Sequence, residues 1–96
     1  MNLDELRERL TSLDKKIIEI IGERQSIVSE IGQYKQQVGR ATRDYERESV
    51  VLNLAKDNAL KAGIDPKLAK EVLQLLILSS LTNQERARVE AEGKGN

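Results

Sequence analysis

The sequence predicts an all-α fold, with three helices in each subunit and a very long first helix. Apolar residues recur at alternating steps of three and four from Leu3 to Val38, which is the seam of one long helix. Gly39 and the Asp65-Pro66 pair mark two breaks that divide the chain into three helical segments. The composition agrees, because the 96 residues include only one proline and two aromatic residues.

The first helix is expected over residues 3–38. It opens near Asn2, carries acidic residues in its first turn, and stops at Gly39 in a left-handed conformation. A helix of this length spans about 50 Å, which exceeds the width of a compact domain of this size. The rest of the chain cannot cover such a seam, so a partner chain must bury it, and a two-fold homodimer is the commonest solution.

One seam position is cationic, because Arg24 stands where an apolar residue is due between Ile20 and Ile27. A buried guanidinium is costly unless it is paired. Arg24 therefore fixes the register, reaches out to water, or lines a cavity that holds an anion. Lys35 lies about 20° from Arg24 around the helix and roughly 16 Å along it, which suits the two ends of a small-molecule pocket. Arg7 lies roughly 25 Å from Arg24 and about 100° off this stripe, so it cannot readily serve the same pocket in its own chain.

The second helix is expected over residues 43–62, capped by Thr42 and ended by Gly63. One face combines polar and apolar side chains: Asp44, Arg47, Glu48 and Val51. These polar residues are either a surface row or part of a site.

The third helix is expected over residues 66–90, with Asp65 as its cap and Pro66 at its first position. Ser80 and Gln84 extend its apolar stripe, either as a frayed end or as hydrogen-bond donors at the mouth of a pocket. Residues 1–92 are expected to form a single domain, and residues 93–96 a flexible tail.

Charge and composition exclude several classes of function. Lys plus Arg and Asp plus Glu number 16 each, so no basic excess predicts a nucleic-acid partner. The chain has no cysteine and no histidine, which removes thiol nucleophiles, imidazole bases and the usual zinc ligands. No signal peptide or membrane span is recognisable, so we expect a cytoplasmic protein with no membrane partner.

The candidate polar residues suit the binding of a small dianion through arginine–carboxylate pairs better than they suit hydrolysis. An enzyme with these groups is expected to catalyse a unimolecular rearrangement, which needs restraint and electrostatic stabilisation and no cofactor or metal. The set consists of Arg7, Arg24, Lys35, Asp44, Arg47, Glu48, Ser80 and Gln84.

Six fragments, in this order and spacing, resemble the all-helical AroQ class of chorismate mutases over residues 3–88. They are Leu6-Arg7-Glu8-Arg9-Leu10, Leu13-Asp14-Lys15-Lys16, Glu23-Arg24-Gln25, Gly32-Gln33-Tyr34-Lys35, Arg43-Asp44-Tyr45-Glu46-Arg47-Glu48 and Ser80-Leu81-Thr82-Asn83-Gln84. The resemblance implies an intertwined homodimer with two sites, which converts chorismate to prephenate by a Claisen rearrangement in phenylalanine and tyrosine biosynthesis, without a cofactor.

The resemblance also implies a role for each site residue. Arg24, and Arg7 from the other subunit, would each bind a substrate carboxylate. Lys35 and Gln84 would donate to the ether oxygen, and Glu48 would accept from the substrate hydroxyl. Arg47 and Asp44 would support the site, and Ser80 would contact the polar rim of the substrate. The apolar walls would be Val28, Ile31, Val51, Ile77 and Leu81.

Two alternatives stay open, an isochorismate-pyruvate lyase and a non-catalytic helical dimerisation module. Glu48 favours the mutase, because the lyase pattern lacks an acid at this position. A dimerisation module would not explain why so many polar residues fall on inward stripes. The loop 36–43 looks short for the family, which leaves its order without a ligand open. No second domain follows, so we expect a monofunctional enzyme.

Overall fold

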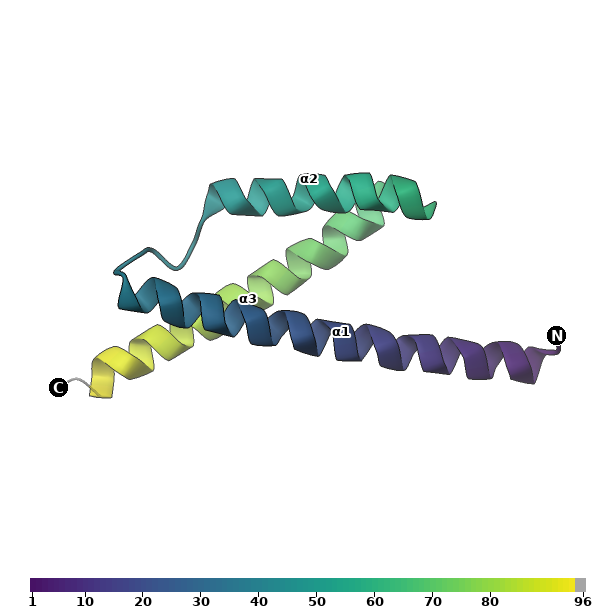
Figure 1. Cartoon of the computed structure of the whole chain (residues 1–96), viewed down its shortest axis with the longest axis horizontal. Helices are drawn as coiled ribbons and strands as arrows, with labels where there is room; N and C mark the ends of the chain where they lie inside the picture. The colour runs from purple at the N-terminus through teal and green to yellow at the C-terminus, as the bar shows by residue number, and fades with distance from the viewer. Residues whose placement is uncertain (95–96) are drawn as a thin grey trace.

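The computed structural model describes residues 1–94 and confirms an all-α chain of three helices. They are α1 (Leu3–Gln37), α2 (Tyr45–Ala62) and α3 (Pro66–Lys94). Figure 1 shows α1 and α2 as two arms, with α3 crossing diagonally behind them. Within the described residues, α3 packs against both other helices, whereas α1 and α2 do not pack against each other.

Both ends of α1 agree with the prediction. Asn2 is the N-cap, and its side-chain oxygen accepts a hydrogen bond of 2.9 Å from the backbone N–H of Glu5. At the other end, Gly39 has φ +70°, and the N–H of Arg40 donates to the Lys35 carbonyl at 2.8 Å. This is the Schellman arrangement, in which a glycine takes the left-handed conformation just after the helix.

Two predicted boundaries were wrong. Asp44 caps α2 in place of Thr42, because the Asp44 carboxylate accepts a 3.0 Å hydrogen bond from the backbone N–H of Arg47. The helix therefore begins at Tyr45, two residues later than expected. In addition, α3 continues to Lys94, so Gly93 and Lys94 are helical and do not belong to a tail. Gly95 and Asn96, the rest of the predicted tail, lie outside the described residues.

The turn between α2 and α3 follows the predicted signals. Gly63 has φ +73°, and the N–H of Ile64 donates to the Ala59 carbonyl at 3.0 Å. The Asp65 carboxylate then accepts from the N–H of Lys67 at 2.9 Å, and Pro66 occupies the first position of α3.

A single chain has only a small core. Among the described residues, the buried apolar side chains are Ala55 and Ala59 of α2 and Ile77 of α3. The radius of gyration is 17.2 Å, whereas a compact domain of this length would have one of about 12.5 Å. The α2–α3 pair therefore holds the core, and α1 adds little to it.

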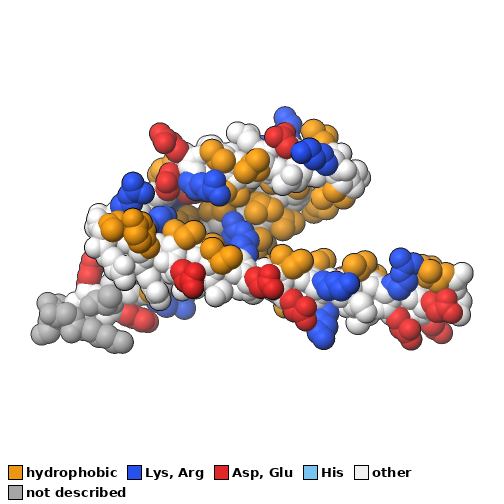
Figure 2. All heavy atoms as spheres, viewed as in Figure 1, with side chains coloured by type: hydrophobic (Ala, Val, Ile, Leu, Met, Phe, Trp, Pro, Cys, Tyr) orange, Lys and Arg blue, Asp and Glu red, His pale blue; other side chains and the backbone are white. Residues whose placement is uncertain are grey.

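The apolar seam of α1 is uncovered. Leu10, Leu13 and Ile17 are each more than half exposed, as is Ile27 farther along the helix. In Figure 2, hydrophobic side chains line the edge of α1 out to its N-terminal end, where no other helix lies over them. Such a long exposed apolar stripe is typical of an interaction surface. None of the described helices is long and apolar enough to cross a membrane.

Candidate active site

Arg24 and Arg47 line the same pocket, which lies between α1, α2 and α3. It has a volume of about 450 Å³, and its walls include Val51, Leu54 and Leu73. The sequence placed Arg24 on the seam of the first helix and Arg47 on the mixed face of the second, and the fold brings the two cations together. The pocket is thus apolar with two guanidiniums, as an anion site requires.

One nitrogen of Arg24 is buried without a hydrogen-bond partner. Nη1 is inaccessible to solvent, and no acceptor for it exists among the described residues. A buried donor without an acceptor loses the full free energy of its hydration. An anion bound beside Arg24 would supply the missing acceptor for this nitrogen.

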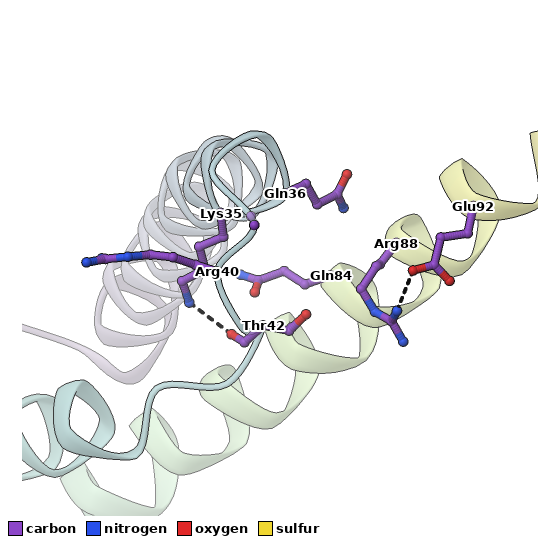
Figure 3. A pocket seen from close by; sticks show the side chains of 9 residues that line it. Lys35, Gln36, Arg40, Thr42, Gln84, Arg88 and Glu92 are labelled. Atoms are coloured by element: carbon purple, nitrogen blue, oxygen red, sulfur yellow. Dashed lines mark hydrogen bonds and ion pairs between the residues drawn. The ribbon is translucent and has the colours of Figure 1, made fainter. Parts of the chain in front are cut away.

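Lys35 and Gln84 line a second pocket of about 400 Å³, where the end of α1 meets α3. Figure 3 shows the Gln84 side chain reaching from α3 toward α1, and Lys35 extending from α1 toward Thr42. The Lys35 ammonium donates a 2.9 Å hydrogen bond to the Thr42 carbonyl oxygen, which ties the loop after α1 back to that helix. The Lys35 ammonium therefore both lines this pocket and holds the loop after α1 in place.

Gln84 is held against the backbone of α1. Its Nε2 donates to the Val28 carbonyl oxygen at 3.3 Å, and its Oε1 is buried without a partner among the described residues. The amide nitrogen carries two N–H groups, so one of them remains for another acceptor.

Ser80 is more deeply buried than a residue at a pocket mouth. It is 5% exposed, and its hydroxyl lies 2.7 Å from Oε1 of Gln25 and 2.9 Å from the Leu76 carbonyl oxygen. The hydroxyl has one proton and donates to one of these acceptors at a time. Ser80 and Gln84 also line a smaller pocket of about 150 Å³ together with Val28. Neither residue belongs to a frayed helix end.

Glu48 is paired with a residue outside the predicted set of site residues. The Arg43 guanidinium donates to Glu48 through Nε and Nη2, both at 3.0 Å, and it stacks over the Tyr45 ring at 4.4 Å from the centroid. The hydrogen bonds to Glu48 raise the pKa of Arg43 above its ordinary value. Arg43 precedes the start of α2, and Glu48 lies five residues later, inside the helix. Residues five apart do not share a helix face, so the sequence pattern did not predict this pair.

The remaining predicted residues are spread over the chain. Asp44 serves as the N-cap of α2. Arg7 is exposed in the N-terminal part of α1, and it does not line the pockets around Arg24 or Lys35. Ile31 is exposed, Ile77 is buried in the core, and Leu81 faces a different pocket. One chain therefore brings together two clusters, Arg24 with Arg47 and Val51, and Lys35 with Gln84, and it leaves Ile31, Ile77 and Leu81 outside both pockets.

Known proteins of one family are similar to this chain. The family described as "Chorismate mutase type II" matches residues 6–85. A chorismate mutase of Methanocaldococcus jannaschii is 26% identical over 92 residues, which cover 96% of this chain and 93% of that protein.

Two larger proteins are also similar. The T-protein of Haemophilus influenzae is 34% identical over 82 residues, 85% of this chain and 22% of that protein. A bifunctional chorismate mutase/prephenate dehydratase of Buchnera aphidicola is 30% identical over 80 residues, 83% of this chain and 21% of that protein. The chain thus spans about a fifth of these two relatives and nearly all of the first.

Proposed function

The chain belongs to the chorismate mutase type II family, and from that premise we propose that it catalyses the rearrangement of chorismate to prephenate. The observation that carries the proposal is that Arg24, whose Nη1 has no hydrogen-bond partner among the described residues, lines one pocket with Arg47. A carboxylate of the substrate would supply the missing acceptor through a charge-assisted hydrogen bond.

The reaction is a unimolecular isomerisation in which the ether C–O bond breaks while a new C–C bond forms. Negative charge grows on the ether oxygen in the transition state, so fixed donors near that oxygen lower the barrier. We assign this task to Lys35 and Gln84, which line one pocket. To donate there, Lys35 would exchange its bond to the Thr42 carbonyl for one to the substrate, and Gln84 would use its second N–H.

We assign the substrate hydroxyl to Glu48. Its two oxygens already accept from Arg43, but an ionised carboxylate offers about four acceptor positions, so a further hydrogen bond is possible. Arg47 would stabilise the substrate carboxylates together with Arg24, while Asp44 would hold the start of α2 and so the direction of Arg47. Ser80 would fix Gln25 beside Arg24.

We also propose a homodimer with shared sites, in which Arg7 of the second copy binds the other carboxylate. The exposed seam of α1 and the small core of the single chain support this assembly. A cytoplasmic location without nucleic-acid or membrane partners is part of the same proposal. The zero net charge of the chain supports the absence of a nucleic-acid partner.

The test is an assay of chorismate consumption with purified protein, in which prephenate and pyruvate are both measured. We expect prephenate to appear in step with chorismate loss and no pyruvate to form. Because the lyase acts on isochorismate, that compound is assayed in parallel. Pyruvate release from isochorismate without prephenate formation from chorismate would favour the lyase, and no turnover of either would favour a dimerisation module.

A further inference from the structure

Gly32 of α1 lies directly beneath the Gln84 side chain of α3. Gly32 is the one buried residue of α1. A Cβ atom built on it would lie 2.9 Å from Cγ and 3.2 Å from Cδ of Gln84. Real Cβ atoms essentially never approach another atom within 3.0 Å, so a side chain at residue 32 would require Gln84 to move.

The missing side chain also determines where the Gln84 amide lies. Val28, whose carbonyl accepts from Nε2 of Gln84, is one helical turn before Gly32. Lys35 is three residues after Gly32 and therefore shares its face of α1. The Gln84 side chain passes over Gly32 and brings its amide into the pocket that Lys35 lines.

We propose that Gly32 is a positioning residue for the reaction, because its lack of a side chain sets the depth and direction of the Gln84 amide beside Lys35. This inference rests on the proposed function only for its kinetic consequence. The geometric part, that Gly32 fixes the place of Gln84, stands without it.

The alternative is that Gly32 serves only helix packing, and Gly22 provides the matched control. Both glycines lie inside α1, where each carries the same intrinsic cost to a helix relative to alanine. A Cβ atom at Gly22 would meet nothing within 4 Å, whereas one at Gly32 would meet Gln84. The two substitutions therefore have the same effect on helix propensity, and they differ in whether the new methyl group meets Gln84.

The first experiment compares Gly32→Ala with Gly22→Ala. We expect the melting temperature to stay the same or rise in Gly22→Ala, because alanine favours a helix, and to rise less or fall slightly in Gly32→Ala, where the new methyl group meets Gln84. We expect kcat to fall only in Gly32→Ala, by about 10- to 100-fold, since a misplacement of about 1 Å can cost a factor of this size. KM should change little, because the arginines that bind the carboxylates are untouched. An unchanged kcat in Gly32→Ala would overturn the inference.

The second experiment asks whether the loss acts through Gln84. In Gln84→Ala, the atoms that a Cβ at residue 32 would strike are gone, so adding Gly32→Ala should cause no further loss of kcat. An equal fold-loss in both backgrounds would show that Gly32 acts independently of Gln84 and would refute the inference.

A third measurement does not depend on activity. The side-chain amide resonances of Gln84, identified in an NMR spectrum by their loss in Gln84→Ala, should shift in Gly32→Ala and stay in place in Gly22→Ala. Unshifted resonances in Gly32→Ala would refute the positioning role even if the protein is an active mutase. Shifted resonances in a protein without chorismate turnover would uphold that role and refute the proposed function.

Discussion

Arg43 holds the carboxylate of Glu48 in a two-pronged hydrogen bond, with Nε donating to Oε2 and Nη2 to Oε1, both at 3.0 Å. Such parallel pairs fix the plane of a carboxylate as well as its charge. The Arg43 side chain is 40% exposed and that of Glu48 is 15% exposed, so the pair lies at the edge of the protein.

We predict that removal of this pair lowers activity more than stability. Arg43→Ala should reduce kcat/KM several-fold, because the Glu48 carboxylate can then rotate, and should lower the free energy of unfolding in urea only modestly, because the Arg43 end of the pair is exposed. Arg43→Lys should restore activity only in part, since an ammonium cannot form the parallel pair. Equal activity in the alanine and lysine variants would show that the geometry of the pair is irrelevant.

We predict that Arg24→Ala and Arg7→Ala are each nearly inactive alone but partly regain activity when mixed. Each lost charge-assisted hydrogen bond costs about 1.5–3 kcal/mol, roughly 10- to 100-fold in rate. In a mixed dimer, one site would carry both changes and the other neither. Activity is measured after unfolding and refolding the variants together, with each variant refolded alone as the control. No recovery in confirmed heterodimers would place Arg7 outside the site.

We predict that Gln84→Glu makes the activity depend on pH. The parent should be insensitive between about pH 5 and 8, because it has no histidine to titrate there. In the variant, only the protonated carboxyl can donate, so kcat/KM should fall as pH rises through the pKa of the new group. Burial beside the Val28 carbonyl would raise that pKa, and the Lys35 ammonium would lower it.

The measurement is kcat/KM over this pH range, with Gln84→Ala as the control that can donate at no pH. If the Glu variant were as active as the parent at every pH, Gln84 would not donate to the reacting oxygen.

We predict a dimer that depends on the seam of α1. Leu13→Glu places a charge on the seam, whereas Thr11→Glu places it on nearly the opposite face of the same helix. The melting temperature of the parent should rise with protein concentration, and Leu13→Glu should abolish that dependence and the dimer in sedimentation. Thr11→Glu should behave like the parent. A monomeric parent with full activity would contradict the assembly.

We predict that acid loosens the last turns of α3. A hydrogen bond from Arg88 lowers the pKa of Glu85 below its ordinary value of 4.5. A carboxyl with a lowered pKa stabilises the fold above its unfolded pKa, and this contribution is lost as pH falls through the folded pKa. An NMR titration of Glu85 should therefore have a midpoint below 4.5 in the parent and move upward in Arg88→Ala.

Arg86→Ala is the control for this titration, because Arg86 is adjacent to Glu85 in the sequence and forms no ion pair among the described residues. If the midpoint moved equally in both variants, the pKa of Glu85 would depend on the loss of any nearby positive charge and not on the hydrogen bond from Arg88.

The helices could be predicted because their limits are set by neighbours in the sequence. Asn2, Gly39, Gly63 and Asp65 each act on backbone groups within a few residues, so their roles follow from residue type and position. The predicted N-cap of α2 was wrong because Thr42 and Asp44 are both residues that cap helices well, and sequence alone does not choose between them. The predicted end of α3 was wrong because only weak helix propensities mark that boundary in the sequence.

Local rules thus determined the fold class, the helix limits, the cationic position on the seam and the set of polar residues that suits a dianion. The tertiary structure decided which of these residues meet. Ser80 reaches Gln25 across 55 residues, and Gln84 reaches Val28 across 56, over a glycine that no periodicity singles out. Such contacts depend on how α3 packs against α1, and that packing is fixed by the shapes of facing side chains, which a pattern of apolar and polar positions does not contain.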